Sequence, residues 1–165
     1  MKRRLLSLLG AFAVLAAAPQ AIADQPLREG LPAEPFTLDA SICGFPVDVT
    51  FPTNREFITT FSSGKQIVTG ALIAQLTNTE TGKSIEINIS GPGILTTDES
   101  GTTTFMLLGR SLVFFSPGQL GPGSAPELLL TSGPATIVFD ENGVVQSFER
   151  TSASAQDLCA ILADP

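Results

Sequence analysis

The sequence predicts one all-β domain, an antiparallel meander of about eight to ten strands with a short helix at its end. Glycines follow polar residues in four turns, at residues 62–65, 79–82, 98–101 and 140–143. Glycine can adopt the positive φ that a tight hairpin requires. Short runs of β-branched and aromatic residues separate these turns, and no long helical period interrupts them. Together, these features favour strands joined by hairpins.

The first 23 residues predict a secretory signal peptide. A basic start, Met1–Arg4, precedes an apolar run over residues 5–18, and Ala21-Ile22-Ala23 forms a small-x-small cleavage site. As a helix the apolar run would extend about 21 Å, which is shorter than the roughly 30 Å hydrocarbon core of a membrane. We therefore expect a secreted protein that does not span a membrane and whose mature form begins at Asp24.

Residues 24–35 predict a flexible leader, because they contain three prolines and one glycine without an apolar period. The single domain follows over residues 36–165. Its cleanest strand is Lys83–Ser90, where isoleucines alternate with polar residues. The other predicted strands are Val47–Phe51, Phe57–Phe61, Gln66–Thr77, Ile94–Thr97, Thr102–Gly109, Ser111–Ser116, Leu128–Thr131, Ala135–Asp140 and Val144–Thr151.

A short helix is expected at the end of the domain. Residues 154–157, Ser-Ala-Gln-Asp, resemble a capping box with Asp in place of Glu or Gln. Leu158, Ile161 and Leu162 then recur at helical spacing. Cys159 would therefore lie on this helix.

The two cysteines predict one disulfide, Cys43–Cys159, because an even cysteine count in an exported chain favours pairing. Such a bond brings the two Cα atoms to within about 6 Å of each other. The beginning and the end of the domain must then meet. This favours a closed or nearly closed β-barrel, with a β-sandwich as the alternative.

The segment Phe105–Phe115 holds more large apolar residues than one buried strand face needs. A strand buries alternate residues against one layer, yet both alternating sets of this segment are apolar. The terminal helix, a second sheet, another subunit or a ligand could cover the surplus. The ligand alternative makes Phe105, Leu107, Phe114 and Phe115 the candidate binding residues.

The composition excludes several chemistries. The chain has no His, so it has neither a Ser-His-Asp triad nor a histidine-based metal site. We predict no catalytic residue, no metal ligand and no cofactor. The formal net charge of −7 becomes three units more negative when Lys2, Arg3 and Arg4 leave with the signal peptide. An acidic chain without a cationic cluster is a poor partner for nucleic acid.

Three classes of function remain. The first is a non-catalytic secreted module that binds a small apolar ligand or a protein partner, and the second is a structural or envelope-associated protein without a ligand. The third is a barrel isomerase or cyclase that works without His and needs a carboxylate inside the fold, for which Asp48, Glu56 and Glu86 are the strand-region candidates. We expect a non-enzymatic role, and the sequence indicates no oligomeric state.

Several short motifs resemble small exported proteins of actinobacteria that have no assigned function. These motifs are Cys43-Gly44-Phe45-Pro46-Val47, Thr77-Asn78 with Thr81-Gly82-Lys83, Ser90-Gly91-Pro92-Gly93 and Asp157-Leu158-Cys159. The similarity extends over most of residues 36–162. It implies a bacterial, exported protein with a disulfide, and it implies no catalytic residue.

Overall fold

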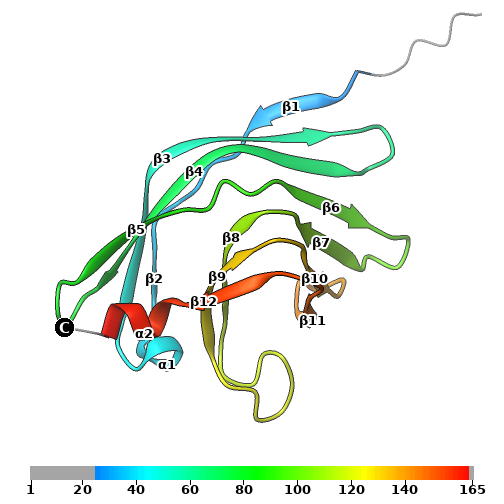
Figure 1. Ribbon diagram of the computed structural model, residues 1–165. Helices are drawn as coiled ribbons and strands as arrows, with labels where there is room; N and C mark the ends of the chain where they lie inside the picture. The colour runs from blue at the N-terminus through cyan, green and yellow to red at the C-terminus, as the bar shows by residue number, and fades with distance from the viewer. Residues whose placement is uncertain (1–24, 164–165) are drawn as a thin grey trace, which may run out of the picture.

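The structure is a computed structural model that describes residues 25–163, so the predicted signal peptide lies outside the described residues. Within residues 25–163, two short helices and twelve strands follow one another (Figure 1). In order, they are β1 (Leu27–Gly30), β2 (Phe36–Leu38), α1 (Ala40–Cys43), β3 (Val47–Thr60), β4 (Gln66–Asn78), β5 (Ser84–Asn88), β6 (Gly93–Thr97), β7 (Thr103–Leu107), β8 (Arg110–Phe115), β9 (Glu127–Ser132), β10 (Ala135–Phe139), β11 (Val145–Arg150), β12 (Ser154–Asp157) and α2 (Leu158–Ala163).

The strands form two antiparallel sheets, which confirms the predicted all-β class. The larger sheet has the order β1-β3-β4-β6-β7-β10-β11, with β2 added beside β3 and β5 beside β4. The smaller sheet has the order β12-β9-β8. Strands make up 55% and helices 7% of the described residues, so the helices cover the sheets at one end without forming a layer of their own.

Several of the strands are halves of longer, bent strands. The successive strands β5 and β6 both pair with β4. The successive strands β7 and β8 pair with two other successive strands, β7 with β10 and β8 with β9. Gly109 lies at the bend between β7 and β8, and Gly133 lies at the bend between β9 and β10. The Gly133 N–H donates to the Gly109 carbonyl over 3.2 Å, so the two bends lie side by side. The chain thus passes from one sheet to the other at these glycines.

The two sheets separate at Gly91. Its N–H donates to the Arg110 carbonyl over 2.9 Å, and the Leu108 N–H donates to the Pro92 carbonyl over 2.9 Å. A Cβ on Gly91 would lie 2.6 Å from the Arg110 nitrogen, so only glycine allows this close approach. Beyond this point, in the described part of the chain, β5 pairs with β4 alone and β8 with β9 alone.

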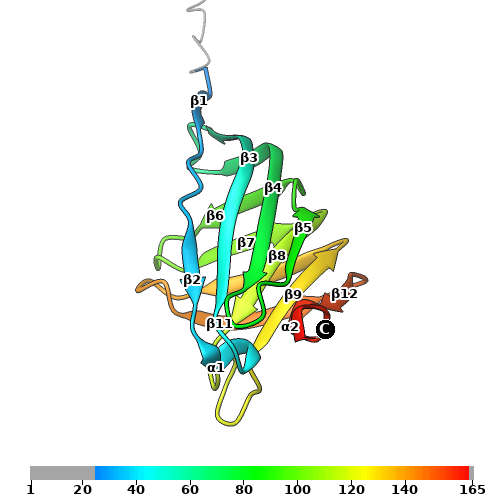
Figure 2. The ribbon, with the colours of Figure 1, turned by 90° about the vertical axis from the view of Figure 1, so that its left-hand side faces the viewer.

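The structure does not support the predicted closed or nearly closed barrel, because neither sheet closes on itself. The barrel was inferred from the disulfide, which does join the two ends of the domain. However, Cys43 lies on α1 and Cys159 on α2, so the bond connects two helices and requires no pairing between the first and last strands. In Figure 2, β2, β3, β4 and β5 form a front layer with β8 and β9 behind it.

Two hydrophobic clusters lie on the two sides of the smaller sheet. The first lies between the β3-β4-β5 layer and β9, and both helices contribute to it through Ile42, Leu158 and Leu162. The second lies on the other side of β8, where Val113 and Phe115 pack against β10 and β11. The smaller sheet therefore has a core on each of its faces.

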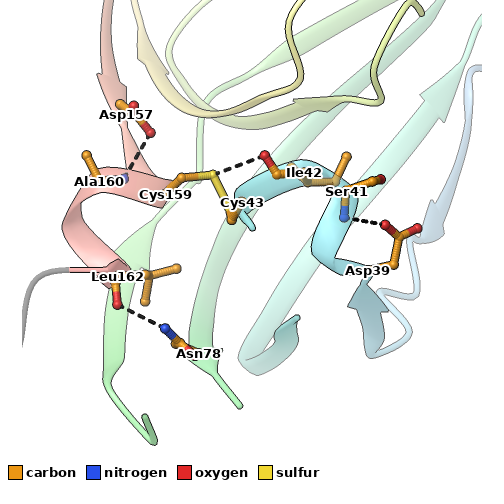
Figure 3. Close-up of a disulfide and its surroundings, with 9 residues drawn as sticks. All are labelled: Asp39, Ser41, Ile42, Cys43, Asn78, Asp157, Cys159, Ala160 and Leu162. Carbon is orange, nitrogen blue, oxygen red and sulfur yellow. Dashed lines mark hydrogen bonds between the residues drawn. A yellow bond between two sulfur atoms is a disulfide. The ribbon is translucent and has the colours of Figure 1, made fainter. Parts of the chain in front are cut away.

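The disulfide and α2 fasten the end of the chain to the first cluster (Figure 3). The Cα atoms of Cys43 and Cys159 are 5.1 Å apart, which confirms the predicted bond. Leu158 and Leu162 are fully buried, and the Leu162 carbonyl accepts from the Asn78 side-chain amide over 3.3 Å. The helix thus covers the first cluster and does not cover the outer face of β7.

The start of α2 differs from the sequence prediction. Residues 154–157, predicted as a helix cap, form β12 and pair with Ser132–Leu129 of β9. The Asp157 carboxylate accepts from the Ala160 N–H over 3.2 Å, so Asp157 caps the helix. Pairing with β9 satisfies the backbone groups of residues 154–157, which the weak capping box would have placed in a helix.

The segment predicted as a flexible leader contains β1. Leu27–Gly30 pair in register with Phe57–Thr60 of β3, and all four residues of β1 are exposed. The Arg28 guanidinium lies 4.2 Å from the centre of the Phe57 ring, which adds a cation–π contact on this outer face.

None of the helices in residues 25–163 is long and apolar enough to cross a membrane.

Candidate functional site

Two apolar chambers adjoin one another inside the bent sheets. The phenylalanine chamber has a volume of about 270 Å³, and the glutamate chamber has a volume of about 250 Å³. Phe105, Leu107 and Leu112 line both chambers, so these side chains form the wall between them. The other walls are Val113, Phe114, Phe115, Gln119, Ile137, Phe139 and Val145 in the phenylalanine chamber, and Leu31, Glu56, Val68, Leu72, Ile89, Gly91, Gly93 and Ser111 in the glutamate chamber.

The structure brings the four predicted ligand-binding residues together on the phenylalanine chamber. Phe105 and Leu107 belong to β7, whereas Phe114 and Phe115 belong to β8 in the other sheet. The bend at Gly109 lets strands that follow each other in the chain face each other across the chamber. That these side chains contact a ligand remains a prediction.

The surplus of apolar residues in Phe105–Phe115 is only partly covered on both strands of this segment. On β8, the Phe115 ring lies 4.9 Å from the Phe148 ring on one side, and the Phe114 ring lies 5.6 Å from the Phe36 ring on the other. Phe115 is thus buried, whereas Phe114 remains 41% exposed despite this contact. On β7, Met106 is likewise 41% exposed on the outer face, whereas Leu107 is buried. The second sheet therefore accounts for part of the surplus.

The ring of Phe105 lies against Gly93 of the neighbouring strand. A Cβ on Gly93 would lie 2.5 Å from Cε2 of this ring, so the glycine makes the room that the ring occupies. Phe105 is only partly buried, although it lies on the inner face of β7. Its ring also lines both chambers and so forms part of the wall that they share.

A β-bulge turns Glu56 toward the interior. Thr50 pairs with Gln75 and Thr53 pairs with Ile73, so β3 has one more residue than β4 across this interval. An extra residue exchanges the two faces of the strand that follows it. Pro52 lies inside the bulge, where its missing N–H breaks no ladder hydrogen bond. The strand then continues with even-numbered residues on its inner face.

Glu56 lies on the inner face beside the buried side chains of β4. It pairs with Gly70, and the pairs on either side are Asn54–Leu72 and Ile58–Val68. Val68 and Leu72 are both 8% exposed, so the face they share with Glu56 is the buried one. Desolvation by burial raises the pKa of the Glu56 carboxyl. Leu31 and Glu56 line both the glutamate chamber and a depression of about 540 Å³ beside β3, and we call the place where the two adjoin the mouth of the glutamate chamber.

The other carboxylates considered from the sequence do not line the chambers. Asp48 is exposed and accepts from the Thr37 hydroxyl over 2.7 Å. Glu86 is exposed on β5. In the turns, Asp98 and Asp140 accept backbone N–H bonds from the residues that follow them. Among residues 25–163, no group of three or more Cys, Asp or Glu side chains could hold a metal ion.

The wall residues contributed by β10 and β11 were not predicted from the sequence. Ile137, Phe139 and Val145 line the phenylalanine chamber, yet each belongs to a strand that reads as an ordinary strand in the sequence. They reach the chamber because β10 pairs with β7, where Ile137 lies opposite Phe105. That pairing depends on the bend at Gly133, which leaves no local signal beyond a Gly-Pro pair.

Comparison with models of protein families, with curated proteins and with solved structures gave no match. The resemblance to exported actinobacterial proteins therefore remains a prediction.

Proposed function

We propose that the protein is a secreted, non-catalytic module that binds a small apolar molecule in the two chambers. The single observation that carries this proposal is the unfilled apolar space between the sheets, where Phe105, Leu107 and Leu112 face both chambers. A disulfide that joins the ends of the described domain supports export, because such bonds persist in oxidising compartments.

The dimensions of the space support a small ligand. An apolar cavity of about 150 Å³ stays free of water and binds a molecule the size of benzene. Each chamber exceeds this volume, and the two adjoin, so together they approach the size of ordinary ligand pockets. A purely structural domain gains stability by filling such space, because unfilled space costs contact energy. The open chambers therefore favour binding over a structural role.

One observation favours the enzymatic alternative as a second candidate. Glu56 is a carboxylate at the mouth of the glutamate chamber, and desolvation raises its pKa. A general base in an isomerase needs such a group within hydrogen-bonding reach of its substrate. Among the described residues, however, no second titratable group lines either chamber. A binding role requires less of the site than proton transfer does.

The proposal is tested with N-phenyl-1-naphthylamine, an uncharged probe that fluoresces in apolar surroundings. We expect the purified protein to bind the probe. The Leu112→Trp variant should bind it about tenfold more weakly, because the larger side chain in the shared wall would occupy part of the space of both chambers. The matched control is Leu108→Trp, at a residue that is 41% exposed. Equal binding by both variants, or no binding by the unmodified protein, would contradict the proposal.

A further inference from the structure

We infer that the ligand is an elongated amphiphile whose cationic head group lies against the Glu56 carboxylate and whose apolar tail passes Phe105 into the phenylalanine chamber. This inference rests on the proposed function, to which it adds the charge and the shape of the ligand.

The first argument is the isolation of Glu56 on an apolar wall. Among residues 25–163, no other titratable side chain lines either chamber. The Glu56 backbone N–H donates to the Asn54 side chain over 2.9 Å, and the Glu56 carbonyl accepts from the Leu31 N–H over 2.9 Å. Its carboxylate has no hydrogen bond or ion pair within the described part of the chain. A partly desolvated carboxylate without a partner is stabilised by a cation that arrives with the ligand.

The second argument is that the local backbone is built to place this carboxylate inside. The bulge between Thr50 and Thr53 sets the inner face of β3, as described above. Gly70, opposite Glu56, has a φ of 139° and carries no side chain that would cover the carboxylate. A Cβ on Gly70 would lie 2.6 Å from the Glu56 Cα, so any other residue would push the strands apart at this point. Bulge and glycine together leave the carboxylate accessible from the chamber.

The third argument is the polarity along the two chambers. Glu56 borders the mouth of the glutamate chamber, whereas the phenylalanine chamber has Gln119 as its one polar wall residue. The Gln119 side-chain oxygen already accepts from the Ser116 N–H over 2.8 Å. A ligand that extends through both chambers therefore meets a charge at one end and apolar side chains beyond it. The excess of 16 acidic over 9 basic residues also favours the approach of a cation.

The test compares probes that share a tail or share a head. Dodecyltrimethylammonium and dodecanol have the same tail, whereas hexyltrimethylammonium has the same head on a shorter tail. The two ammonium probes are titrated by calorimetry below the concentrations at which they form micelles, and dodecanol below its solubility limit. Each is titrated into the unmodified protein, Glu56→Gln and the matched control Glu86→Gln. The control removes the same charge from an exposed position that lines neither chamber. Far-UV circular dichroism verifies that each variant is folded.

We expect Glu56→Gln to lower the affinity for dodecyltrimethylammonium about tenfold and to leave dodecanol binding unchanged. Glu86→Gln should change neither affinity, and the hexyl probe should bind at least about tenfold more weakly than the dodecyl probe. The inference would be overturned if Glu56→Gln and Glu86→Gln lost equal affinity for dodecyltrimethylammonium, or if the dodecyl and hexyl probes bound with equal affinity. Either result would leave the proposed function standing. Failure of dodecanol and of both cations to bind would overturn the inference and the proposed function together.

Discussion

Removal of the disulfide should destabilise the protein without changing its fold. The bond joins residues 116 positions apart in the sequence, and a cross-link of this span restricts the unfolded chain by about 4.8 kcal/mol in the polymer-entropy relation. The double variant Cys43→Ser, Cys159→Ser keeps Leu158 and Leu162, which are fully buried in the first cluster. Because natural disulfides commonly contribute about 2–4 kcal/mol, we expect a loss in that range, with the polymer value as an upper limit.

Urea unfolding at pH 7 measures this loss. The chain has no Trp or Tyr, so far-UV circular dichroism is the suitable signal. The uncrosslinked unfolded chain exposes more surface than the crosslinked one, and the slope of the unfolding free energy against urea should therefore increase in the variant. A domain of this size typically has a stability of about 5–15 kcal/mol, so most of the variant should remain folded in water.

A second variant tests where the disulfide acts. Leu162→Ala removes buried contacts of α2 in the native state, whereas the entropy argument places the effect of the bond in the unfolded state. The cost of Leu162→Ala should therefore be the same with and without the bond, within about 0.5 kcal/mol. A total loss below about 1 kcal/mol, or a strong coupling between the two changes, would refute the reasoning.

Three further changes have defined outcomes. Gly70→Ala should lower the free energy of unfolding in urea by more than about 2 kcal/mol, because φ at Gly70 is 139° and the new Cβ would overlap the β3 backbone. In the control Gly30→Ala the new Cβ meets nothing within 4 Å, so the loss should be small. Equal losses in the two variants would contradict this reasoning. Leu128→Ala, at a fully buried residue of the first cluster, should cost about 2–5 kcal/mol by thermal or urea unfolding, and a loss below about 1 kcal/mol would show that the cluster is loosely packed. Burial raises the pKa of Glu56, so the native protein loses stability as the pH rises from the ordinary pKa of 4.5 through the raised pKa. Glu56→Gln should therefore be more stable than the unmodified protein at pH 7, and this advantage should vanish below about pH 4. An advantage that is independent of pH would exclude the carboxylate as its cause.

The sequence predicted strands well where their alternation is local. Lys83–Ser90 contains the observed β5, and Ile87 and Ile89 are buried as the period of two requires. The extent of β3 was less well predicted, because residues 52–56 separate two short apolar runs and their strand conformation depends on pairing with β4. The strand β12 was read as a helix start, since its conformation depends on pairing with β9.

Half of the candidate site could be predicted from the sequence. The excess of apolar residues in residues 105–115 identified Phe105 and Leu107 as residues that need a cover. The opposite wall, including Ile137, could not be predicted, because it depends on where the chain passes between the sheets. Glu56 was one of three carboxylate candidates, and Pro52 was the signal for a bulge that would have distinguished it.

The bulge in β3 also bears on how such a binding site could diverge in evolution. Deletion of Asn54, just after the bulge, would move every later residue of β3 by one position along β4 and so onto the opposite face. Arg55 and Phe57 would then enter the chamber wall in place of Glu56. A single codon lost or gained at this position could therefore exchange an acidic mouth for a basic or an aromatic one. Homologues that differ in length by one residue at this position should accordingly differ in the charge of the ligand they select.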